Sequence, residues 1–102
     1  MMEQELWQQF RTRFIQSTTT RLQRARAIIA GGDPANDALA SELHALAGEA
    51  SVLGVDGMAK IARDAERAAK YWGAASSDIA LAQACKTAID NLDAALRDLD
   101  RS

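Results

Sequence analysis

Apolar residues recur every three or four positions along the first third of the chain, the spacing that places them on one face of an α-helix. They are Leu6, Trp7, Phe10, Phe14, Leu22, Ala25, Ile28 and Ile29. A polar run, residues 17–20, interrupts this stripe with side chains that favour helix caps and local backbone bonding. We therefore expect either one long helix with a weak point, or a break near Ser17 that leaves an extra short N-terminal helix. Gly31 and Gly32 should end this segment, because glycine readily adopts the left-handed conformation at helix ends.

Three further helices follow from the same spacing. Asp33 as N-cap and Pro34 in the first turn predict the start of a second helix, which carries Leu39, Leu43, Leu46, Ala50 and Leu53. A turn at residues 54–57, with Asp56 as cap, leads into a third helix over residues 57–72 that ends at Gly73. Ser76 and Ser77 should cap the fourth helix, which runs to the C-terminus. Short loops favour antiparallel neighbours, so we predict an all-α, up-down four-helix bundle formed by a single domain, residues 1–102.

Composition excludes several classes of function. The net charge of −2 argues against nucleic acid as a partner, because phosphate binding needs a concentrated basic surface. The only cysteine, Cys85, cannot form an internal disulfide and should be a buried hydrophobe, and one cysteine with one histidine makes no zinc site. No apolar run approaches the roughly 20 residues of a membrane span, and the N-terminus lacks the features of a signal peptide. We expect a cytoplasmic protein without a bound metal.

The only histidine, His44, falls on the second helix, roughly 130–140° away from its leucine stripe at 100° per residue. Its helical neighbours are small: Ala40, Ser41, Ala47, Gly48 and Ser51. A mid-helix glycine costs about 1 kcal/mol relative to alanine, and the close approach of another surface would explain Gly48. The pattern therefore indicates an exposed imidazole within a docking surface. An ordinary surface histidine in an alanine-rich chain is the alternative that helix geometry leaves open.

Antiparallel packing adds two candidates from the third helix. If the chain reverses near Val55, residues whose numbers sum to about 110 lie at similar heights along the two helices, which sets Glu66 level with His44 and Arg63 level with Ala47. A carboxylate that accepts from Nδ1–H would fix the imidazole tautomer and leave Nε2 as a free nucleophile. Arg63 could offer positive charge to a phosphoryl group. Both residues could equally form an exposed charge pair on one helix.

The stretch around the histidine resembles the signature of histidine-containing phosphotransfer (HPt) domains. The matching residues, at the spacing of that family, are His44, Leu46, Gly48, Ala50, Leu53 and Gly54. The resemblance extends over essentially the whole chain and implies that His44 is phosphorylated on Nε2, with Glu66 as its hydrogen-bond partner. It implies receiver domains of response regulators and sensor or hybrid histidine kinases as partners. It also implies a phosphocarrier without turnover of its own and without a bound cofactor.

One position departs from the family. Where HPt domains carry a lysine one turn after the histidine, this chain has Ala47. Either Arg63 or Lys60 then supplies the missing positive charge, or phosphotransfer is weakened or restricted to particular partners. A docking module that binds a receiver or kinase without being phosphorylated is the main alternative. We expect the aromatic residues to have structural roles. Trp7 and Phe10 should close one end of the bundle, and Trp72 should pack at the end of the third helix.

Overall fold

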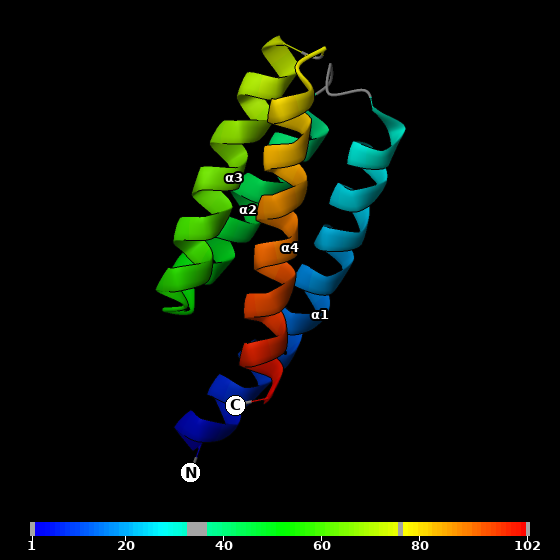
Figure 1. Ribbon diagram of the computed structural model, residues 1–102. Coiled ribbons are helices and arrows are strands. Elements are labelled where there is room, and N and C mark those ends of the chain that lie inside the picture. The colour runs from blue at the N-terminus through cyan, green and yellow to red at the C-terminus, as the bar shows by residue number, and fades with distance from the viewer. Residues whose placement is uncertain (1, 33–36, 76, 102) are drawn as a thin grey trace.

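Four helices account for nearly all of the described residues (Figure 1). The computed structural model describes residues 2–32, 37–75 and 77–101. Its helices are α1 (Met2–Gly31), α2 (Ala38–Val52), α3 (Asp56–Ala74) and α4 (Ile79–Arg101). These ranges contain no strand, so the all-α prediction is confirmed.

The helices form an elongated bundle of 53 × 20 × 18 Å in which each runs antiparallel to the one before it (Figure 1). Helix α2 packs against α1 and α3, and α4 packs against α3 and α1. Among the described residues, the backbones of the two diagonal pairs, α1 with α3 and α2 with α4, do not approach one another closely. The bundle is therefore a square, up-down arrangement, in which α2 has one neighbour on each side and an outer face left free.

Helix α1 runs without interruption through the polar segment 17–20, so of the two alternatives the single long helix is confirmed and the separate short N-terminal helix is wrong. Two of its hydroxyls bond to the preceding turn of the same helix, Thr19 to the carbonyl of Ile15 at 2.7 Å and Thr20 to that of Gln16 at 3.2 Å. The side chain of Thr18 is fully buried in the bundle. The hydroxyls of Thr19 and Thr20 are satisfied within the helix, whereas the buried Thr18 hydroxyl has no hydrogen-bond partner among the described residues. Burial of one face of α1 by α2 and α4 outweighs the low helix propensity of these residues.

Glycines in the left-handed conformation follow two of the helices, where the sequence predicted helix ends. Helix α1 ends at Gly31, and Gly32 follows in the left-handed region with φ of 67°. The α2–α3 turn contains a second left-handed glycine, Gly54, with φ of 75°. The predicted start of α2 at Asp33 and Pro34 lies outside the described residues, and the first helical residue described there is Ala38.

Three other predicted helix ends are wrong. The N-cap of α3 is Val55, so Asp56 is the first helical residue rather than the cap, and α3 continues through Gly73 to Ala74. Asp78 caps α4, because its Oδ1 accepts from the backbone N–H groups of Ala80 and Leu81. Ser77 is therefore not the cap, and Ser76 lies outside the described residues. A carboxylate one residue nearer the helix reaches its free N–H groups, which Ser77 does not.

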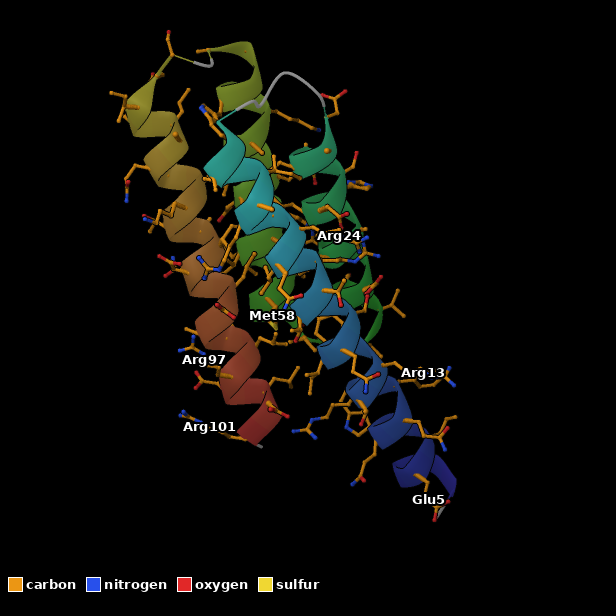
Figure 2. All side chains as sticks on the ribbon, turned by 90° about the vertical axis from the view of Figure 1, so that its right-hand side faces the viewer. Glu5, Arg13, Arg24, Met58, Arg97 and Arg101 are labelled. Carbon is orange, nitrogen blue, oxygen red and sulfur yellow. The ribbon has the colours of Figure 1, made fainter. Side chains whose placement is uncertain are left out.

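The core is made of leucine and alanine, with Trp72 and Cys85 buried as predicted. The prediction that Trp7 and Phe10 close one end of the bundle is wrong, because their side chains are 43% and 44% exposed. The first turns of α1 extend beyond α2 and α3, where no second helix is available to cover them (Figure 1). Glu5 marks this extension in Figure 2.

Ion pairs also connect α2 to α1. Arg21 binds Glu42 at 2.9 Å and Glu49 at 2.8 Å, and Arg24 reaches Glu42 at 3.2 Å. Both carboxylates of α2 therefore face α1. His44 lies on a different side of the same helix and is turned toward α3 and solvent.

Candidate functional site

The imidazole of His44 projects from the middle of α2 into solvent, with 78% of its side chain exposed. Its neighbours in the chain explain this position, because Leu43 and Leu46 are fully buried and fix which side of the helix faces the core. The structure therefore places His44 on the outer face of the bundle, as the periodicity predicted.

Glu66 of α3 holds one nitrogen of that ring. His44 Nδ1 lies 3.2 Å from both carboxylate oxygens of Glu66, whose side chain is only 14% exposed. An ionised carboxylate can only accept a hydrogen bond, so the proton of the neutral ring must be on Nδ1. This tautomer leaves a lone pair on Nε2, in a ring whose side chain is largely exposed.

The same carboxylate has a second partner on its own helix. Lys70 Nζ lies 3.1 Å from Glu66 Oε2. Partial burial by itself raises the pKa of the Glu66 carboxyl, but hydrogen bonds from Lys70 and His44 outweigh it and leave that pKa below its usual value. The ionised contact is therefore present above the ordinary titration range of glutamate and is lost only as the pH falls through this lowered pKa.

The structure does not connect the other two predicted cations to the histidine. Lys60 Nζ lies 3.7 Å from Asp64 on its own helix. Arg63 is exposed, and within residues 2–32, 37–75 and 77–101 it forms no hydrogen bond or ion pair. Sequence reasoning missed Lys70, although its position four residues after Glu66 is the spacing of an intrahelical ion pair and could have revealed it.

The predicted docking surface is only partly exposed. Ser41, Gly48 and Ser51 face solvent, but Ala40 and Ala47 are buried, with exposures of 8% and 4%, so the prediction is wrong for these two alanines. Because α2 packs against both α1 and α3, the buried part of its surface is wider than the stripe of leucines and includes these two alanines. At Gly48, a Cβ atom would meet no neighbouring atom within 4 Å, which leaves open space one turn from His44.

A hollow of about 560 Å³ adjoins this surface between the first half of α1 and the end of α2. It is lined by Phe10, Arg13, Phe14, Ser17, Gly48, Glu49, Val52 and Leu53. Gly48 belongs both to this hollow and to the surface around His44. The sequence signal was the apolar stripe at the start of α1, which sequence reasoning assigned to bundle closure because the length of α1 relative to its neighbours was unknown.

The geometry suits a nucleophile that is presented to a large partner. Among the described residues, no group of three or more histidine, cysteine, aspartate or glutamate side chains could hold a metal ion. None of the helices over these ranges is both long and apolar enough to cross a bilayer. What the site offers is one oriented imidazole on an open face of the bundle.

Comparison with known proteins agrees with this arrangement. The family model described as Hpt domain matches residues 9–97, which is most of the chain. No curated protein and no solved structure gave a significant match. The matched region includes the whole of α2 and α3, with the histidine and the glutamate that orients it. The chain therefore belongs to the Hpt domain family, whose members take part in histidine phosphotransfer within phosphorelays.

Proposed function

We propose that this protein is a cytoplasmic phosphocarrier that accepts a phosphoryl group on His44 Nε2 and donates it to, or receives it from, the aspartate of a receiver domain. The observation that carries the proposal is the contact of 3.2 Å between His44 Nδ1 and Glu66, which orients an exposed ring. A sensor or hybrid histidine kinase would supply the phosphoryl group at the start of the relay. The protein itself would carry out no net reaction.

The chemical step needs little from this chain beyond the oriented nitrogen. The Nε2 lone pair attacks the phosphorus of an aspartyl phosphate, and the bond between phosphorus and the aspartate oxygen breaks, with its electrons remaining on the carboxylate. Neutral imidazole is a competent nucleophile near pH 7. Glu66 holds the ring in the reactive orientation and stabilises the positive charge that the ring gains when Nε2 forms the new bond.

The receiver would dock on the outer face of α2. Ser41, Gly48 and Ser51 leave room beside the imidazole, and the adjoining hollow offers the exposed apolar side chains of Phe10 and Val52. Such a patch beside a reactive group is typical of a protein interaction surface. A docked receiver would cover His44 and this hollow together.

We expect Phe10→Ser to weaken receiver binding by roughly tenfold, because a partly exposed aromatic residue at an interface contributes about 1–2 kcal/mol. The affinity would be measured by titration with an unphosphorylated receiver. Ile79→Ser, which removes an even more exposed apolar side chain at the first residue of α4, is the control and should leave the affinity unchanged. Equal affinity for Phe10→Ser and the wild type would exclude the hollow from the interface.

Arg63 remains the candidate to replace the lysine that the family carries where this chain has Ala47. Arg63 lies on the helix that carries Glu66 and forms no ion pair within the described part of the chain, whereas Lys60 lies 3.7 Å from Asp64. We expect Arg63→Ala to slow phosphotransfer by roughly 2- to 5-fold, since exposed charge pairs are worth about 0.5–1 kcal/mol. Single-turnover transfer from a labelled receiver measures this rate, with the exposed Arg67→Ala as control. An unchanged rate would remove Arg63 from the mechanism.

The proposal as a whole is tested by in-vitro phosphotransfer from a panel of phosphorylated receivers and kinases. A phosphocarrier should take up label that is lost in acid and retained in alkali, as expected for a phosphorus–nitrogen bond. A protein that binds receivers tightly but takes up no label from any donor would instead be a docking module.

A further inference from the structure

The carboxylate of Glu66 is shared between two positively polarised groups. His44 Nδ1 lies 3.2 Å from Oε1 and from Oε2, and Lys70 Nζ lies 3.1 Å from Oε2. Glu66 is mostly enclosed, while both of its partners are largely exposed. The carboxylate therefore links the ammonium of Lys70 to the histidine ring.

We propose that Lys70 is a positioning residue that acts through Glu66 to set how readily a phosphoryl group leaves His44. For transfer to an aspartate this inference rests on the phosphocarrier function proposed above. The link between Lys70, Glu66 and the ring is a property of the bundle and can be tested without any partner protein.

The proton on Nδ1 decides how good a leaving group the ring is. When an oxygen nucleophile attacks the phosphorus, the phosphorus–nitrogen bond breaks and its electron pair returns to Nε2. A ring that keeps its Nδ1 proton leaves as neutral imidazole, whereas a ring without that proton would have to leave as an anion. Glu66 favours the protonated ring because a carboxylate beside Nδ1 stabilises the positive charge.

Lys70 reduces this stabilisation. Its ammonium neutralises part of the carboxylate charge that would otherwise act on Nδ1, so the phosphorylated ring gives up its Nδ1 proton at a lower pH. The phosphohistidine then survives longer. Because Lys70 is exposed and screened by solvent, we expect an effect of a few-fold in rate rather than orders of magnitude.

Other charged groups around Glu66 are directed elsewhere. On α2, Glu42 and Glu49 bind Arg21 of α1. The α4 side chains that line the hollow against α3 are uncharged, namely Ala80, Gln83, Ala84, Thr87, Ala88 and Asn91. On α3 itself, Lys60 and Arg67 pair with Asp64, and Arg63 forms no ion pair within the described part of the chain. Lys70 is thus the cation in contact with the carboxylate that orients the histidine.

The test uses the full chain, phosphorylated chemically with phosphoramidate, a small phosphoryl donor that needs neither a kinase nor a receiver. The hydrolysis rate of phospho-His44 is followed from pH 6 to 9. We expect Lys70→Gln to move the midpoint of the pH–rate profile upward by about half a unit, a roughly threefold faster loss of phosphate at a fixed pH on the alkaline side. Lys70→Arg, which keeps the charge, should behave as the wild type.

A double variant separates action through Glu66 from a direct effect on the ring. In a Glu66→Gln background, Lys70→Gln should cause no further change. Lys86→Gln, an equal loss of charge on α4, is the control for net charge and should also have no effect. An unchanged profile for Lys70→Gln, the same shift in the Glu66→Gln background, or failure of Lys70→Arg to restore the wild-type profile would overturn the inference. Failure of receivers to label the wild type would instead contradict the proposed function alone.

Discussion

His44→Gln is expected to abolish phosphorylation by every receiver or kinase that labels the wild type. Glutamine fills similar space but offers no nucleophilic nitrogen, and its amide nitrogen cannot replace the Nε2 lone pair. Because the side chain is 78% exposed and outside the core, the fold should be retained, with a change in unfolding free energy within about 0.5 kcal/mol. The measurement is transfer of labelled phosphate from a charged receiver.

This experiment is unusually clean in this protein because the chain has only one histidine. No second imidazole can take up phosphate and mask the loss. Binding of the unphosphorylated receiver to the variant is the control, since docking should persist when only the reactive nitrogen is removed. Full labelling of His44→Gln would contradict the assignment of His44 as the phosphoryl acceptor.

The second large effect is expected at Gly48, where a side chain should stabilise or be tolerated by the fold but hinder docking of the receiver. Gly48→Ala should raise the free energy of unfolding by about 0.5–1 kcal/mol, because alanine is the better helix former and the added Cβ meets no neighbour within 4 Å. Gly48→Gln should also be accommodated by the isolated bundle. Its longer side chain would, however, occupy the space one turn from His44 into which the receiver docks.

We expect Gly48→Gln to lower the transfer rate at subsaturating receiver by roughly 10- to 100-fold, since overpacking costs about 1–3 kcal/mol. Thermal unfolding measures the stability, and single-turnover transfer measures the rate. Phosphorylation by phosphoramidate should be unaffected in this variant, because so small a donor does not need the docking surface. A Gly48→Gln protein that exchanges phosphate at the wild-type rate would show that receivers do not approach across this face.

These predictions assign two tasks to different residues, namely orientation of the imidazole and access of the receiver to it. Glu66 contacts Nδ1 of the ring, and we propose that its other partner, Lys70, adjusts the electrostatics of that hydrogen bond. We propose that Gly48 and the hollow beside Phe10 govern access by the receiver. Mutations of the two kinds should therefore be distinguishable by comparing a small chemical donor with a receiver.

Helical periodicity alone determined the features that depend on one helix at a time. The leucine spacing placed His44 on the exposed side of α2. Glycines at the expected helix ends, together with short loops, predicted four antiparallel helices. The register of an antiparallel pair then brought Glu66 level with His44, and the structure contains that contact. Such predictions succeed because backbone geometry is nearly the same in every α-helix.

The tertiary structure decided what depends on the neighbours of a helix. Burial of Thr18 between helices keeps α1 continuous where local propensity favours a break. Packing of α2 on both sides buries Ala40 and Ala47, and the extension of α1 beyond its neighbours leaves Trp7 and Phe10 exposed. The ion pair of Glu66 with Lys70 was missed, because Arg63 and Lys70 both lie about one turn from Glu66 and helical spacing does not choose between them. Burial and the pairing of long side chains are set by the surfaces that meet, and a one-dimensional pattern does not contain them.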